Sequence, residues 1–489
     1  MNKTSFFQKS GIRSVLASVI SILIGLLAGS ILIFFVGLFS PAISPKGTWE
    51  GIQLVNAGLF SIGRDASGAL TFGFNPTNIG NMLFRATPLI LTGLSVAVAF
   101  KTGLFNIGAP GQYLAGTCAT LFIALSLSTG GGALYDWQVA QGIAPTLIFP
   151  AWLVWTLALL GGMMAGAIWG AIPGMLKSLL NINEVLACIM TNWIAANLVT
   201  WAFDISNLKN LIEGTKTSYI YKTSFNNVET SKMGLDKIFP NSQVNGGIII
   251  AILLAVIVYV ILTRTTFGYQ LKACGSNRFA ARYAGIKDKR NIVLSMAIAG
   301  SLAGAAGALY SLSGNTEFFW TTYQQLPAVG FNGIPVALLA SNHPIGVIFA
   351  GIFMSMLDIC GLQLTKFTAF NEYITDVIIA VIVYMSAFAL LIKTMLGKRR
   401  RKADTLLESD ANAEPAAAEE APAQEAAQPD EEAVADAVEE APVAEAMETV
   451  AAEPVFEAAA EAVQEIPVAE PVEEPAPIAE SAGEEEENV

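Results

Sequence analysis

The sequence is poor in charge, histidine and cysteine. Only 14% of its 489 residues are charged, and His343 is the one histidine. The four cysteines are Cys118, Cys188, Cys274 and Cys360, and none belongs to a CxxC pair. These absences exclude histidine-rich metal chemistry and give no support to a zinc site, a redox motif or a disulfide scaffold. We therefore expect no metal and no cofactor, and we expect no nucleic-acid partner.

The chain also lacks a GxxxxGK[ST] phosphate loop, the glycine-rich segment that cradles ATP in many nucleotide-binding proteins. Paired acids and nucleophile motifs are missing too, which argues against an enzyme. Long uncharged apolar runs are abundant instead, at a mean hydropathy of +0.54. Such runs exclude a soluble globular enzyme and indicate membrane spans.

The few charges fall in two unlike regions. From Ala403 onward there are 27 acidic residues and no lysine or arginine, whereas residues 1–402 hold 13 acidic and 27 basic residues. Segment 399–489 therefore starts as a basic boundary and continues as an acidic tail rich in Ala, Glu and Pro. This tail cannot bury enough apolar surface to offset the entropy of ordering, so we expect it to be disordered. It is either dispensable, or a tether for a basic cytoplasmic partner, or a segment that inhibits the protein by contact with its own basic inner loops.

We predict an all-α integral membrane protein with about ten transmembrane helices, because a helix of about 20 apolar residues crosses the hydrocarbon layer with every backbone group satisfied. The ten runs are 15–39, 82–100, 103–128, 149–176, 184–203, 246–263, 291–312, 328–341, 345–362 and 374–396. The transmembrane domain is then 15–398, after a short N-terminus at 1–14. Only four residues separate the two runs within 328–362, which form either two spans or a re-entrant hairpin and one span.

Basic residues near span ends favour the cytoplasmic side. The loop 264–290 holds seven basic residues and one acid, and five consecutive basic residues occupy 398–402. With ten spans, both features lie inside and both termini are cytoplasmic. The segments 40–81 and 204–245 then lie outside, although the second contains five lysines.

Glycines recur every four residues at 162, 166, 170 and 174, and again at 300 and 304. On a helix this spacing leaves a stripe without side chains, where another helix can approach closely. We predict tight helix packing at both stripes. Sliding of the helices during gating is the alternative interpretation.

Three polar segments interrupt the apolar pattern. One is FNIGAPGQ at 105–112, and polar backbone at membrane depth is tolerated only against protein or a water-filled cavity. The second is Asn181-Ile182-Asn183-Glu184, where Glu184 suits the positive end of a helix dipole. The third is the basic loop 264–290. Its basic residues either only reflect the preference for positive charge on the cytoplasmic side, or they belong to a segment that docks on a cytoplasmic protein.

These segments carry a family resemblance. FNIGAPGQ, NINEVLACIMTNWIA, GSNRFAARYAGI and GFNGIPVALLASNHPIG resemble motifs of permease subunits in the branched-chain amino acid, ribose and nucleoside group of ATP-binding-cassette (ABC) importers. The nucleoside and simple-sugar branch is the most similar. The resemblance covers about 80–395, with the motifs in family order. Pro335 and Ala340-Ser341 depart from the family pattern.

The resemblance implies a fold similar to type II ABC importer permeases and a bacterial cell-membrane location. It implies inward translocation of nucleosides or simple sugars, energised by a separate ABC ATPase subunit. A second permease chain and an extracytoplasmic substrate-binding lipoprotein complete such an importer. The loop 264–290 corresponds to the coupling region that contacts the ATPase. Its candidate coupling residues are Gly275, Asn277, Arg278, Arg282 and Tyr283.

A nucleoside or sugar is neutral and rich in hydroxyl groups, so it needs amide partners and an aromatic side chain for stacking. The candidate pathway residues are Asn106, Gln112, Asn192, Trp193, Asn315, Phe331 and Asn332. Each of the polar ones is alternatively a hydrogen-bonding residue between helices. An ion-coupled secondary transporter is the alternative function, and the scarcity of intramembrane acids argues against it.

Overall fold

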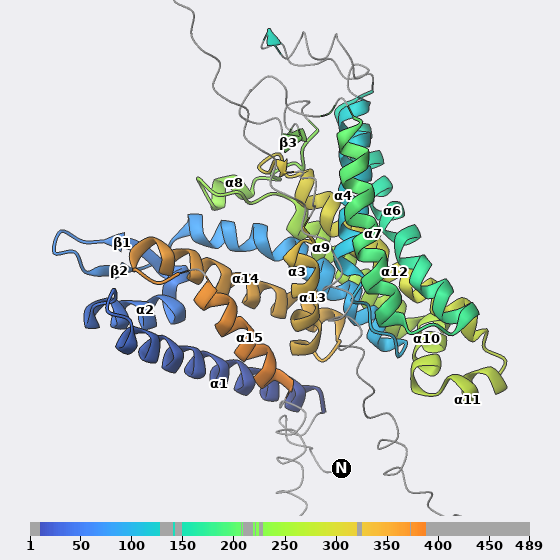
Figure 1. Cartoon of the computed structure of the whole chain (residues 1–489), viewed down its shortest axis with the longest axis horizontal. Helices are drawn as coiled ribbons and strands as arrows, with labels where there is room; N and C mark the ends of the chain where they lie inside the picture. The colour runs from blue at the N-terminus through green and yellow to red at the C-terminus, as the bar shows by residue number, and fades with distance from the viewer. Residues whose placement is uncertain are drawn as a thin grey trace, which may run out of the picture. The chain divides into compact units, whose positions relative to one another are not determined.

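The computed structural model describes residues 10–127, 140–141, 149–206, 208, 219–220, 222–223, 228–319, 325–371 and 373–387. These residues are mainly helical, with two short antiparallel strand pairs (Figure 1). Residues 1–9 and the segment 399–489 lie outside them. The predicted cytoplasmic termini and disordered tail therefore stay predictions.

The helices follow one another along the chain as α1 (Ser10–Phe39), α2 (Pro45–Ala57), α3 (Pro76–Lys101), α4 (Ala109–Ser126), α6 (Ala151–Leu180), α7 (Glu184–Asp204), α8 (Leu235–Ile238), α9 (Gly247–Arg264), α10 (Thr266–Ser276), α11 (Arg278–Tyr283), α12 (Asp288–Ser311), α13 (Ala328–Leu339), α14 (Pro344–Phe367) and α15 (Tyr373–Ala387). The strands are β1 (Ser61–Arg64), β2 (Leu70–Phe72), β3 (Tyr219–Ile220) and β4 (Phe318–Phe319).

Each predicted apolar run overlaps one of these helices. Among the described residues, six helices are long and apolar enough to cross a membrane, namely α3, α6, α7, α9, α12 and α14. The chain is thus a multi-pass membrane protein, and the total of ten spans stays a prediction. The run that begins at 103 in the sequence starts as a helix only at Ala109, because the polar segment before it is not helical.

Helix α13 is short for a span. Its 12 residues rise about 18 Å, whereas the hydrocarbon layer is about 30 Å thick. It is joined to α14 by a tight connection in which Ser341 and Asn342 have φ of 50° and 57°. This geometry favours the re-entrant alternative for 328–362.

Polar residues at the helix starts fix where the helices begin. Asn75 caps α3, because its side chain accepts a hydrogen bond from the Asn78 backbone N–H at 3.1 Å, and Pro76 follows. Asn183, rather than Glu184, caps α7 by accepting from the Val185 N–H at 2.9 Å. Glu184 instead pairs with Lys177 at 2.9 Å, across the turn that joins α6 to α7.

Helix α3 is the central element of the bundle. In its most apolar segment 83% of the residues are buried, and the helix packs against α9, α12, α13 and α14. In the most apolar segment of α6 only 28% of the residues are buried, so most of the apolar surface of α6 is left for lipid. The first polar interruption of the sequence therefore begins at the end of the most enclosed helix.

The two glycine stripes meet each other, which confirms the predicted close packing. A β-carbon built on Gly166 would lie 2.8 Å from the Cα of Gly304, and one on Gly170 would lie 3.0 Å from the Cα of Gly300. Helices α6 and α12 therefore touch backbone to backbone. Helix α4 joins them, because a β-carbon on Gly116 would lie 2.5 Å from the Cα of Gly304.

The two ends of α12 mark the two ends of the bundle. Helices α10 and α11 precede its first residue, whereas β4 follows its last turn and pairs with β3 (Figure 1). The strand pair ties the predicted outer segment 204–245 to the chain after α12. At the end of α14, Arg64 donates to Glu50 Oε2 and to the Phe367 carbonyl, each at 2.7 Å, which joins the β1–β2 hairpin to α2 and α14.

Candidate functional site

The break between α3 and α4 is organised by two buried amide side chains. Asn106 Nδ2 donates to Gln112 Oε1 at 2.8 Å, and Gln112 Nε2 donates back to Asn106 Oδ1 at 3.0 Å. Asn106 Nδ2 also donates to Ser95 Oγ, and its Oδ1 accepts from the Gly108 backbone N–H, both at 3.0 Å. All the hydrogen-bonding capacity of the Asn106 side chain is thereby used inside the protein.

Asn192 on α7 completes this arrangement from another part of the chain. Its Oδ1 accepts from the Gly111 backbone N–H at 3.0 Å, and its Nδ2 donates to the Ile107 carbonyl at 3.0 Å. Gly111 lies in the first turn of α4, where backbone N–H groups have no partner within the helix. Asn106, Gln112 and Asn192, which we call the amide cluster, therefore hold the non-helical break between α3, α4 and α7.

The other pathway candidates lie apart from the amide cluster. Trp193 is 53% exposed on the side of α7 away from it, and Asn315 donates to the Gln243 carbonyl at 3.0 Å in the predicted outer region. Phe331 is exposed and Asn332 half-buried in the first turn of α13. That turn does reach α4, because a β-carbon on Gly330 would lie 2.5 Å from the Cα of Pro110. The structure brings together three of the seven candidates.

The predicted coupling region folds as two short helices. Asn277 separates them and caps α11, because its side chain accepts from the Ala280 N–H at 2.9 Å. Phe279 and Tyr283 on α11 are 72% and 95% exposed. Two large aromatic side chains thus stand in solvent at the predicted cytoplasmic end of the bundle.

The two coupling arginines share one carboxylate. Arg278 Nε donates to Asp288 Oδ2 at 2.7 Å, and Arg282 Nη2 donates to the same oxygen at 2.8 Å. Asp288 is buried at the start of α12 and is the one acid between residues 264 and 290. Asp288 was not among the predicted coupling residues, although a single acid among seven basic residues is a visible signal.

Gly275 connects the coupling region to the amide cluster. A β-carbon on Gly275 would lie 2.6 Å from the Lys101 carbonyl oxygen and 2.9 Å from the Gly103 nitrogen. Gly103 has a φ of 69°, a left-handed conformation that favours glycine. The last turn of α10 therefore packs directly on the backbone that leads, three residues later, to Asn106.

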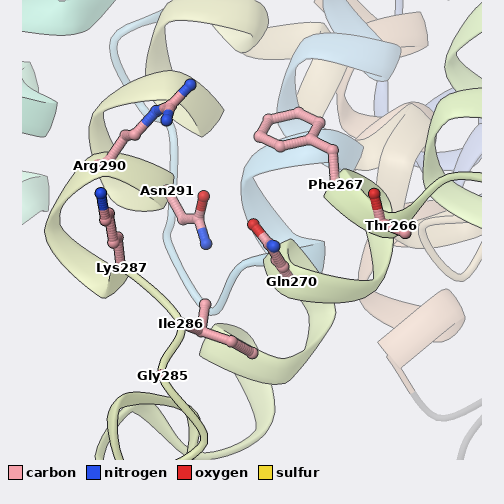
Figure 2. Close-up of a pocket in the computed structure, with 8 residues that line it drawn as sticks. All are labelled: Thr266, Phe267, Gln270, Gly285, Ile286, Lys287, Arg290 and Asn291. Atoms are coloured by element: carbon pink, nitrogen blue, oxygen red, sulfur yellow. The ribbon is translucent and has the colours of Figure 1, made fainter.

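A cavity of about 370 Å³ lies beside the coupling residues, between the first turns of α10 and α12. Figure 2 shows Lys287 and Arg290 on one side of it and Thr266 and Gln270 on the other. Phe267 and Asn291 also line the cavity, whereas none of the predicted coupling residues does.

Comparison with known proteins gives consistent matches. A family model described as branched-chain amino acid transport system / permease component matches residues 78–387. The guanosine ABC transporter permease protein NupP of Bacillus subtilis is 33% identical over 388 residues, which cover 79% of this chain and 97% of that protein.

Two further relatives resemble the chain over most of their length. The nucleoside ABC transporter permease protein NupB of Lactococcus lactis is 36% identical over 347 residues, or 68% of this chain and 89% of that protein. The glucose ABC transporter permease protein TsgB13 of Haloferax volcanii is 30% identical over 298 residues, or 60% of this chain and 70% of that protein.

Proposed function

The chain belongs to the family of branched-chain amino acid transport system permease components and is a permease subunit of an ABC importer, and we propose that it carries nucleosides. The observation behind this substrate class is that the relatives NupP and NupB, at 33% and 36% identity, are named as guanosine and nucleoside permeases. The glucose permease is less similar at 30%, so simple sugars are the second candidate.

The energy for transport comes from a separate ATPase subunit that docks on α10 and α11. No phosphate loop occurs in the chain, so it needs a nucleotide-binding partner. Phe279 and Tyr283 are the exposed anchors that we assign to this contact, because aromatic side chains contribute strongly to protein interfaces. Asn277 and the Arg278–Asp288–Arg282 bridge hold α11 in place beneath them.

Movement of the ATPase reaches the pathway through Gly275. A displaced α10 pushes on the Lys101–Gly103 backbone, because no side chain lies between them to absorb the motion. This backbone continues into the break held by the amide cluster. The cluster is buried and satisfied within the protein, so we assign it to positioning α4 and α7 rather than to direct contact with the substrate.

We therefore assign the contacts with the substrate to residues that are less buried. Phe331 and Asn332 lie in the first turn of α13, beside the first turn of α4, and supply an aromatic ring and an amide for a nucleoside. Asn315 lies in the predicted outer region, and Trp193 faces outward from α7. These four remain our candidates for the pathway.

We place the chain in the bacterial cell membrane with both termini in the cytoplasm. The segments 40–81 and 204–245 would then face an extracytoplasmic substrate-binding lipoprotein, and a second permease chain would complete the pathway.

The test is uptake of radiolabelled guanosine, adenosine and ribose by cells with and without the gene. We expect uptake of the nucleosides to require the chain and to be abolished by a hydrolysis-deficient ATPase subunit. Uptake that survives loss of the ATPase but is abolished by an uncoupler would instead support the ion-coupled alternative. Uptake of ribose alone would overturn the nucleoside assignment.

A further inference from the structure

The cavity between α10 and α12 carries an inference beyond transport of the substrate. It lies where two candidate spans end, since α9 finishes at Arg264 and α12 begins at Asp288. Its lining residues Thr266 and Lys287 are within two positions of these ends. In the orientation proposed above, the cavity therefore opens at the depth of the headgroups of the inner leaflet.

The charges around the cavity are positive. Lys287 and Arg290 line it, and neither forms an ion pair with any other described residue. Asp288 lies between them in sequence, but it is turned to Arg278 and Arg282 and does not line the cavity. The one nearby acid is thus already engaged, and the two basic side chains keep their charge for another anion.

The other residues that line the cavity suit a ligand in which a phosphate group is attached to an apolar body. Gln270 and Asn291 bring amide groups toward the centre, and Thr266 adds a hydroxyl group (Figure 2). Asn291 is 97% buried, and the one hydrogen bond of its Nδ2 to the described residues is a long one, 3.7 Å to Cys274 Sγ. Phe267 supplies an apolar surface beside these polar groups.

We propose that this cavity binds the phosphate of an anionic phospholipid from the inner leaflet. Basic pockets between helices on the cytoplasmic side of a membrane bind such headgroups. Lys287 and Arg290 neutralise the phosphate, and the amides of Gln270 and Asn291 and the hydroxyl of Thr266 donate hydrogen bonds to its oxygens. The bound lipid holds α10 against the first turn of α12, next to the contact made by Gly275.

The experiment measures lipid retained by the full chain. The protein is purified in detergent after incubation with vesicles of phosphatidylglycerol or of phosphatidylcholine, and bound lipid is counted by native mass spectrometry. We expect retention of phosphatidylglycerol and not of phosphatidylcholine. The double variant Lys287→Gln/Arg290→Gln should bind phosphatidylglycerol about thirtyfold more weakly, and each single variant about fivefold.

Lys289→Gln is the matched control, because Lys289 is exposed on the same turn but does not line the cavity. It removes the same charge and should retain lipid as the unchanged protein does. Equal loss of lipid in Lys289→Gln and in the double variant would overturn the proposal in favour of general surface attraction. Monodispersity and thermal melting of each variant establish that the compared proteins are folded.

Two further experiments distinguish an anionic lipid from other ligands of the cavity. Excess inorganic phosphate should leave the lipid bound, and displacement of the lipid by it would assign the cavity to a soluble phosphate compound. Co-purification of the ATPase should persist in the double variant. Loss of the ATPase with full lipid retention would assign Lys287 and Arg290 to the protein contact and overturn the lipid site.

Discussion

Gly275 and Gly103 meet backbone to backbone at the point where the predicted coupling region touches the end of α3. A β-carbon on Gly275 would lie 2.9 Å from the Gly103 nitrogen, closer than ordinary contacts allow. The coupling region and the amide cluster are therefore joined through a contact in which neither residue has a side chain.

Gly275→Ala tests this contact. The added methyl group forces the two segments apart, and overpacking of this kind costs about 1–3 kcal/mol. We expect the ATPase to co-purify with the variant, but nucleoside uptake to fall at least about tenfold. Ser276→Ala, a change at the exposed neighbouring position, is the control and should leave uptake unchanged. Normal uptake by Gly275→Ala would contradict transmission through this contact.

Asn192→Ala tests whether the amide cluster positions helices or binds substrate. The change leaves the Gly111 N–H and the Ile107 carbonyl without their partner, and a buried unpaired group costs about 1–3 kcal/mol. We expect lower thermal stability and a lower maximal uptake rate at an unchanged half-saturating nucleoside concentration. Asn197→Ala on the same helix is the control, because Asn197 is exposed and, within the part of the chain that the structure describes, bonds only the Trp193 carbonyl in the preceding turn. A raised half-saturating concentration at an unchanged maximal rate would favour direct substrate contact.

Phe279→Ala/Tyr283→Ala tests the docking surface for the ATPase. Burial of an aromatic side chain contributes about 1.5–3 kcal/mol, so loss of both should weaken ATPase association more than about tenfold. Both side chains are exposed, and we expect the melting temperature of the isolated chain to stay unchanged. Tyr373→Ala, at another exposed tyrosine, is the control for general surface effects. Full recovery of the ATPase with the double variant would place the docking surface elsewhere.

Glu50 gives the contact between α2 and the β1–β2 hairpin a pH dependence, because it binds Arg64. The hydrogen bonds from Arg64 hold the pKa of Glu50 below its usual value of 4.5, against the opposing effect of burial. Glu50 therefore contributes stability in full above pH 4.5 and loses it as the pH falls through the lowered folded-state pKa. We expect the difference in melting temperature between the unchanged protein and Glu50→Gln to be large at about pH 7 and to shrink toward about pH 3. A difference that does not change over this range would show that Glu50 is not the group responsible.

The sequence was most informative where a periodic pattern decides the structure. Apolar runs located the helices, and the four-residue spacing of Gly162, Gly166, Gly170 and Gly174 predicted the close contact that α6 makes with α12. The start of α3 is also decided locally, because the capping Asn75 followed by Pro76 starts a helix through interactions within its first turn. These features depend on neighbouring residues in the chain.

Contacts between residues that are far apart in the chain could not be predicted from the sequence. Asn106 and Asn192 were both selected as polar residues in apolar surroundings, but their joint role depends on contacts across more than 80 positions. Trp193 was selected for its chemistry, and only the rotation of α7 within the bundle decides that it is exposed whereas Asn192 is buried. Arg278 and Arg282 were expected to serve the ATPase, whereas in the structure both bind Asp288. Charge reversal at these arginines would therefore also disturb α11 itself.

The glycine contacts between α6 and α12 have a mechanical consequence for alternating access. A helix pair separated by side chains can absorb strain through rotamer changes, but a pair in direct main-chain contact has no such compliance. Helices α6 and α12 must then move as one rigid unit, with α4 attached through Gly116. The hinges of the transport cycle then lie where this unit meets the rest of the bundle.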